Sequence, residues 1–161
     1  MRGAGAARWL CLHTLTLVPT INYAVAITLE RDDRRRWLVA RVVGTLTLDD
    51  ALAFIESVRV APVTLTWPLL FDARSAKSGV TDADVGRLIE ALARLRNTRR
   101  PPRAHAAMVA DDDVLYAQCL LYETGLVQIG VRTIRVFRRL PDAERWLNIL
   151  SAARHFGADL I

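Results

Sequence analysis

The sequence predicts an α/β domain with a mixed five-stranded sheet, in which an N-terminal antiparallel hairpin is followed by parallel β-α-β crossovers. First, the chain has 161 residues, 52% hydrophobic and 24% charged, which is enough to bury a core and excludes a disordered chain. Second, two extended segments near the start flank a short charged turn. Third, apolar strands then alternate with amphipathic helices, and such crossovers require parallel strands with helices packed on the sheet.

The beginning of the chain differs in composition from the rest. It has no acidic residue before residue 27, and Arg2 and Arg8 precede an apolar run over residues 9–18, as in a signal peptide. Polar residues interrupt this run, which is too short to cross a bilayer. A start placed too far upstream is another open interpretation. We expect a cytoplasmic location, and secretion through this segment stays open as the alternative. We expect little packing of this segment and divide the chain into a leader, one domain and a tail: residues 1–23, 24–155 and 156–161.

The hairpin is predicted from two extended runs, residues 25–30 and 37–43, separated by the polar turn 31–35. Gly44 is expected to end the second strand. Thr47 with Asp50 then has the spacing of a capping box, which opens a helix that runs to about residue 60.

The next strand is predicted over residues 65–72, where an apolar run is typical of a buried parallel strand. We expect residues 73–80 to form a loop of small residues. Thr81 and Asp84 form a second capping box, and a helix with one apolar stripe follows to about residue 97.

The last two strands are predicted over residues 104–110 and 133–137. The helix between them opens at residues 111–113 and ends at Gly125 or Gly130. Pro141 suits the first turn of the final helix. We expect eight apolar side chains of these elements to be buried together: Leu70, Phe71, Leu88, Leu92, Val109, Val136, Phe137 and Trp146.

Composition and motifs exclude several classes of function. The net charge is +5, but aromatic residues are only 7% and none lies within the basic loop formed by Arg99, Arg100 and Arg103, which disfavours nucleic-acid binding. Two cysteines cannot make a zinc site or a disulfide framework by themselves. His105 lies in a predicted buried strand, where a hydrogen-bonded core histidine is the simplest interpretation, and Cys119 reads as a small apolar side chain. No nucleophile motif and no cofactor motif are present.

Several short segments, in this order and spacing, resemble the SpoIIAA-like family within the STAS fold of anti-sigma-factor antagonists. They are Val-Gly-Thr-Leu-Thr at 43–47, Leu-Phe-Asp-Ala-Arg at 70–74, Met-Val-Ala-Asp-Asp at 108–112, Tyr116, Tyr122-Glu123, Arg-Val-Phe-Arg at 135–138 and the segment 143–147. The resemblance implies a small cytoplasmic, non-enzymatic regulatory or ligand-sensing domain without a cofactor or a membrane span. Its partner would be a protein, such as a kinase or an anti-sigma-type regulator, or a small apolar ligand, because this family has been likened to lipid-carrying domains.

The resemblance also points to a partner surface at the start of the second helix. Family members carry a phosphorylated serine there in an Asp-Ser-Ser-Gly pattern, whereas this chain has Ser-Gly-Val-Thr-Asp at 78–82. Ser78 and Thr81 are therefore the candidate phosphoacceptors, with Asp72 and Arg74 beside them. The competing interpretation of Thr81 is a capping hydroxyl completed by Asp84.

A second hypothesis uses four aspartates that follow the strands. Asp72, Asp111, Asp112 and Asp113 should meet at the carboxyl edge of the sheet, where carboxylates could bind Mg²⁺ for receiver-type phosphoryl transfer. The alternative is that the last three only cap a helix and complement its dipole. On either hypothesis we expect the functional surface at this edge, centred on residues 73–84.

Overall fold

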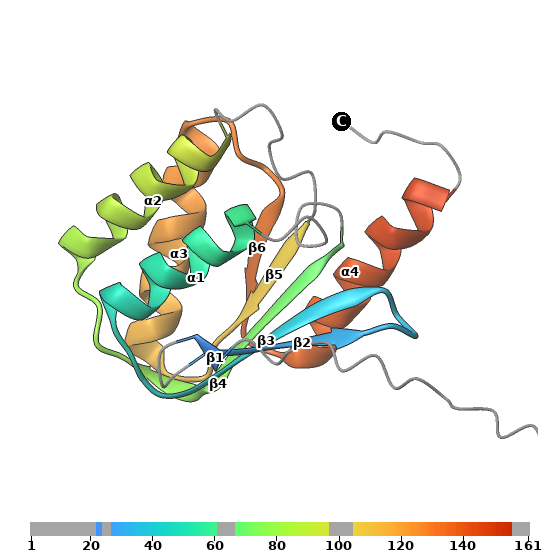
Figure 1. Ribbon diagram of the computed structural model, residues 1–161, viewed down its shortest axis with the longest axis horizontal. Coiled ribbons are helices and arrows are strands. Elements are labelled where there is room, and N and C mark those ends of the chain that lie inside the picture. The colour runs from blue at the N-terminus through green and yellow to red at the C-terminus, as the bar shows by residue number, and fades with distance from the viewer. Residues whose placement is uncertain (1–21, 24–26, 61–66, 97–104, 156–161) are drawn as a thin grey trace, which may run out of the picture.

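The computed structural model describes residues 22–23, 27–60, 67–96 and 105–155, and it confirms the predicted α/β fold (Figure 1). The sheet order follows the chain. The strands are β1 (Asn22–Tyr23), β2 (Ile27–Asp32), β3 (Trp37–Leu46), β4 (Leu69–Ser78), β5 (Ala106–Val109) and β6 (Ile134–Phe137). The helices are α1 (Leu48–Val60), α2 (Asp82–Arg96), α3 (Asp113–Gln128) and α4 (Leu140–His155).

The sheet is mixed as predicted. β2 pairs antiparallel with β1 and β3, while β3, β4, β5 and β6 pair in parallel. Three crossovers that step in the same direction across a sheet place their helices on one face, because each crossover is right-handed. Accordingly, α1, α2 and α3 lie on one face and α4 lies on the other (Figure 1). No helix in the described part of the chain is long and apolar enough to cross a membrane.

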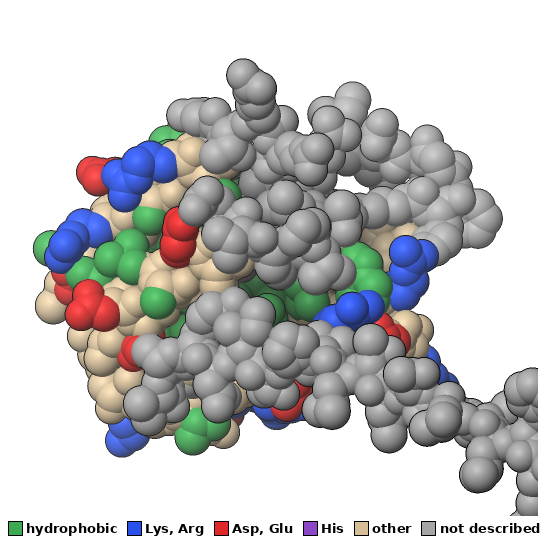
Figure 2. Space-filling view, in the orientation of Figure 1, with side chains coloured by type: hydrophobic (Ala, Val, Ile, Leu, Met, Phe, Trp, Pro, Cys, Tyr) green, Lys and Arg blue, Asp and Glu red, His purple; other side chains and the backbone are tan. Residues whose placement is uncertain are grey.

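The helix layer has two levels. α2 packs mainly against α1 and α3 and spans the space between them. Gly125 allows α2 to approach α3 closely, since a Cβ atom at this position would lie 2.2 Å from Cδ1 of Ile89. Over α1 and α2, charged side chains of both signs are intermixed and form no patch of one sign (Figure 2).

The predicted loop at residues 73–80 is wrong, because β4 continues to Ser78. β3 likewise continues past Gly44, which has φ +86° but does not end the strand. The two extensions pair with each other up to Leu46 and Ser78, across a register shift beyond Arg41. Long-range pairing therefore sets the length of both strands.

The predicted capping boxes are confirmed. The Thr47 backbone N–H donates to Asp50 Oδ2 at 3.1 Å, and the Asp50 N–H donates back to Thr47 Oγ1 at 3.2 Å. Thr81 and Asp84 make the same exchange at 3.1 and 3.3 Å. Each pair satisfies amides that a helix start leaves without partners.

α3 ends at Gln128, and Gly130 rather than Gly125 is the glycine of its C-terminal cap. Gly130 has φ +82° and donates to the Val127 carbonyl at 3.0 Å, while Val131 donates to the Leu126 carbonyl at 2.8 Å. This is the Schellman arrangement, which is completed by the apolar contact of Val131 with Leu126. The turn that leads into β6 is therefore fixed by hydrogen bonds on both of its amides.

The predicted leader is partly corrected. Asn22 and Tyr23, which we assigned to it, form β1 and pair with Thr28 and Ile27. The remaining leader residues and the tail 156–161 lie outside the described residues, as does the basic loop with Arg99, Arg100 and Arg103.

The prediction of one shared core is wrong, because the sheet divides these side chains between its two faces. Leu70 and Val109 pack with α4, whereas Phe71 packs with the helix layer. Successive strand residues point to opposite faces, so neighbours in sequence cannot share a core. Four further members of the predicted set are only half-buried: Leu88, Val136, Phe137 and Trp146.

Candidate functional site

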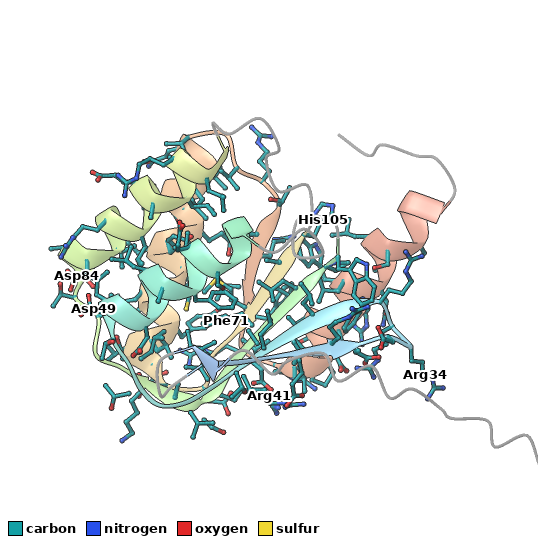
Figure 3. The ribbon with its side chains drawn as sticks, viewed as in Figure 1. Arg34, Arg41, Asp49, Phe71, Asp84 and His105 are labelled. Carbon is teal, nitrogen blue, oxygen red and sulfur yellow. The ribbon has the colours of Figure 1, made fainter. Side chains whose placement is uncertain are left out.

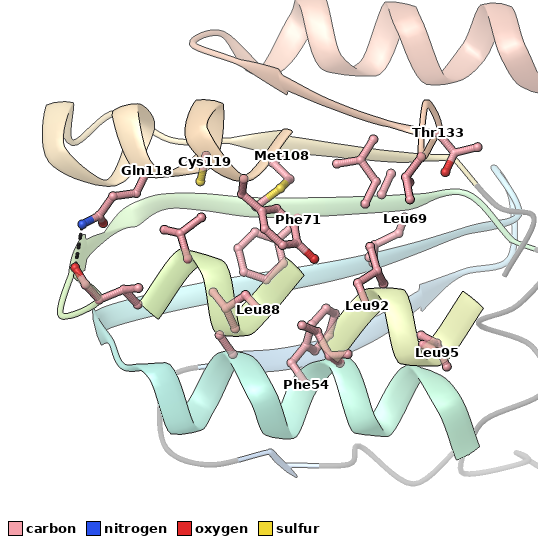
Figure 4. Close-up of a pocket in the computed structure, with 18 of the residues that line it drawn as sticks. Phe54, Leu69, Phe71, Leu88, Leu92, Leu95, Met108, Gln118, Cys119 and Thr133 are labelled. Carbon is pink, nitrogen blue, oxygen red and sulfur yellow. Dashed lines mark hydrogen bonds between the residues drawn. The ribbon is translucent and has the colours of Figure 1, made fainter. Parts of the chain in front are cut away.

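A cavity of about 440 Å³ lies between the sheet and the layer of α1, α2 and α3 (Figure 4). The sheet forms its floor through Leu69, Phe71 and Met108, and α2 forms its roof through Leu88 and Leu92. α1 and α3, on which α2 packs, form its sides. The wall is overwhelmingly apolar.

The size of this cavity sets it apart from ordinary packing defects. Protein interiors are close-packed and contain few voids larger than a water molecule, whereas ligand pockets measure about 300–1,000 Å³. Leu88, Met108 and Tyr122 line the cavity and keep accessible surface although they belong to the inner side of the domain. The space is therefore a preformed pocket within the helix layer.

One end of the cavity is closed by a polar link between β4 and α3. Gln118 is buried, and its side-chain amide donates to the Val80 carbonyl at 2.6 Å. The Ser78 hydroxyl donates to Gln118 Oε1 and accepts from the Val80 backbone N–H at 3.1 Å. The amide of Gln118 and the hydroxyl of Ser78 are thus paired with each other and with the backbone. Figure 4 shows the bond from Gln118 at this end of the cavity.

The titratable groups in the side wall are neutral. Burial raises the pKa of the Cys119 thiol to about 12 and also raises the pKa of the Tyr122 phenol. A thiol with such a pKa is not a nucleophile at neutral pH, since the thiolate is the reactive form. Cys119 therefore acts as the small apolar side chain that the sequence predicts.

The other end of the cavity reaches solvent at the turn from α3 to β6. Among the described residues that line the cavity, only Gly130 and Arg132 are exposed, and both belong to this turn. Thr133, which follows them, lies at the end of the cavity away from Gln118 (Figure 4). The cavity thus has a buried end at Gln118 and an opening at Arg132.

His105 borders the cavity, but its ring belongs to the other side of the sheet. The ring meets Trp146 of α4 edge-on, with 5.7 Å between the ring centroids. His105 itself directly precedes β5 (Figure 3). His105 precedes Ala107 by two residues, and Ala107 packs with α4. His105 is therefore half-buried, and its ring lies towards α4.

Of the predicted partner surface, Asp72 and Arg74 lie on the α4 side of the sheet. Arg74 donates from Nε to Asp72 Oδ1 at 2.8 Å and from Nη2 to Oδ2 at 2.9 Å, and Nη1 of Arg41 lies 3.7 Å from Oδ2. The hydrogen bond from Arg74 holds the pKa of the buried Asp72 carboxyl below its usual value, against the opposing effect of burial. Arg74 is therefore already paired with a carboxylate.

Ser78 and Thr81, the other two candidates, lie towards the helix layer. Ser78 is tied to Gln118, and the Thr81 hydroxyl donates to Asp84 Oδ2 at 2.7 Å. This bond is the largest cause of the lowered pKa of Asp84. The structure thus places the two predicted phosphoacceptors beside the closed end of the cavity, apart from Asp72 and Arg74.

The four aspartates of the second hypothesis have separate partners. Asp112 is the N-cap of α3 and accepts from the Leu115 N–H at 2.9 Å, while Asp113 pairs with Arg138 at 2.7 Å. Asp111 is exposed, and Asp72 is held by Arg74. Within the described ranges, no group of three or more His, Cys, Asp or Glu side chains is arranged to hold a metal ion.

The cavity is the feature that the sequence did not reveal. Leu88, Leu92 and Met108 have the spacing of ordinary core residues, and only the position of α2 above the sheet turns them into walls. Comparison of the chain with protein families, with curated proteins and with solved structures finds no match.

Proposed function

We propose that this domain is a non-enzymatic, STAS-like ligand-sensing module that binds a small apolar ligand between the sheet and the α1–α3 layer. The observation that carries the proposal is the apolar cavity of about 440 Å³. A preformed apolar pocket with few polar groups is the usual form of a small-molecule site. The described wall of the cavity holds no thiolate and no metal-binding cluster that could carry out a reaction.

The wall can supply enough free energy for useful binding. Each buried methylene contributes about 0.8 kcal/mol, so an alkyl chain of ten methylenes gains roughly 8 kcal/mol. Association costs about 4–15 kcal/mol, and a rigid, preformed site keeps this cost near the low end. At this low-end cost, a chain of ten methylenes retains about 4 kcal/mol of net binding free energy, so binding of a twelve-carbon compound is favourable.

A protein partner would sense the ligand at the start of α2. Val80 lines the cavity, is held by Gln118, and directly precedes the exposed Thr81. A ligand that contacts Val80 would move this backbone and change the surface at Thr81. This coupling supports a regulatory partner that distinguishes the empty domain from the filled one.

The hypothesis of a Mg²⁺-dependent domain is less well supported, because its aspartates serve the α3 cap and two ion pairs. We expect millimolar Mg²⁺ to leave the melting temperature unchanged, since only a ligand that binds the folded state raises it.

Calorimetric titration with 1-dodecanol, below its solubility limit, tests the proposal. We expect saturable binding of one molecule per chain. Leu88→Trp fills the cavity from its roof and should weaken binding at least about tenfold, which corresponds to 1.4 kcal/mol. Val114→Trp is the matched control, because Val114 is exposed on α3 and does not line the cavity.

Ala106→Leu obstructs the same space from the floor, so it provides a second test of the site if Leu88→Trp does not fold. Cooperative melting of each variant must be verified first. Absence of dodecanol binding to the wild-type domain, or equal affinity in all variants, would refute the proposed site.

A further inference from the structure

We propose that the cavity takes a single-chain amphiphile with a carboxylate headgroup, which Arg132 binds at the opening while the alkyl tail extends towards Gln118. This inference rests on the proposed function and adds the chemical class and the orientation of the ligand.

The opening fixes where a headgroup can remain in water. Gly130 and Arg132 are the exposed members of the described wall, and the other residues of this wall are buried or half-buried. A charged headgroup is costly to bury, whereas an alkyl chain gains free energy from burial. An amphiphile would therefore enter tail first and leave its headgroup at Arg132.

The charge of the opening selects the headgroup. No Asp or Glu lines the described part of the cavity, and Arg132 is its one guanidinium. Nearby Arg135 and Arg138 lie close to Glu123 and Asp113, while Arg132 forms no ion pair with any described residue. A guanidinium presents paired N–H donors that match a carboxylate, so an anionic headgroup complements this position.

The turn that carries Arg132 is held in place on both sides. Val131 is buried and hydrogen-bonded to Leu126, and Ile134 pairs with Ala106 in the sheet. This support reduces the ordering cost of binding a headgroup there. At the opposite end, Gln118 and Ser78 already bond each other, so a headgroup would have to break these bonds. Both ends favour the same orientation.

The test compares three twelve-carbon probes below their micelle concentrations: dodecanoate, 1-dodecanol and dodecyltrimethylammonium. At low salt, the wild-type domain should bind dodecanoate about tenfold more tightly than dodecanol, and the ammonium compound most weakly. Arg132→Gln should equalise dodecanoate and dodecanol while leaving the affinity for dodecanol unchanged. Arg94→Gln is the control, because Arg94 is exposed on α2 and does not line the cavity.

The outcomes separate this inference from the proposed function. Equal wild-type affinities for dodecanoate and dodecanol would overturn the carboxylate inference and leave the apolar site intact. Loss of the preference in Arg94→Gln as well would also overturn it, because the preference would then come from the general positive charge. Binding of none of the three probes would refute the proposed function itself.

Discussion

The two faces of the sheet are covered in opposite ways. A single helix, α4, seals one face, where Trp37 is 1% exposed and Ala107, Ala143 and Leu147 are 0% exposed. Three helices cover the other face and still leave about 440 Å³ unfilled. The number of covering helices therefore does not decide how well a face is packed.

Small residues at the contact explain the packed face. Ala107 on β5 and Ala143 on α4 allow close approach, so Leu147 and Trp37 fill the remaining space. On the other face, α2 packs mainly on α1 and α3. Its apolar stripe then faces the cavity instead of a complementary surface.

The largest expected effect is the difference between matched leucine truncations on the two faces. Leu147→Ala should cost about 2–5 kcal/mol, because it leaves a cavity in a close-packed core. Leu88→Ala should cost only about 1 kcal/mol, since Leu88 is half-buried and already borders empty space. Urea unfolding of both variants measures the difference, and equal costs would contradict it.

A smaller effect is expected from the ion pair on the α4 side. Asp72→Asn should cost about 1–3 kcal/mol, because it weakens two charged hydrogen bonds from Arg74. Since the folded-state pKa of Asp72 is lowered, its stabilisation is complete above the unfolded value of 3.8 and disappears as the pH falls through the folded value. Acid unfolding curves should therefore converge for wild type and variant below this pH. A constant gap at all pH values would argue against the pair.

The smallest effect concerns the helix starts around the cavity. Thr81→Ala and Thr47→Ala should each cost about 1 kcal/mol, because each removes one half of a capping box. Hydrogen exchange should reveal faster opening at the start of α2 in Thr81→Ala and at the start of α1 in Thr47→Ala. Faster exchange spread evenly over α4 would show that the two faces do not open separately.

Local features could be predicted from the sequence, whereas features that depend on distant contacts could not. The two capping boxes and the Asp112 cap lie within four residues of their partners, so residue identity and spacing were sufficient. The extension of β4 through Arg74 and Ser78 was missed, because the side chains on its buried face are small and its length depends on pairing with β3.

The candidate site was predictable only in part. The position of Thr81 at the start of α2 was correct. Asp72 and Arg74, however, lie on the other side of the sheet from Ser78, because β4 has an extra residue between Asp72 and Ser75 that reverses the alternation of its side chains. The cavity could not be foreseen, since Leu88 and Met108 have the pattern of core residues. Only the tertiary packing of α2 on α1 and α3 distinguishes a wall from a core.

A crystal structure under xenon pressure tests the difference between the two faces most directly, because xenon occupies empty apolar cavities and not close-packed cores. We predict xenon, or an elongated apolar molecule retained from purification, between Met108 and Leu88, and no such density between the sheet and α4. An empty map on both faces, with α2 packed directly onto the sheet, would contradict the account.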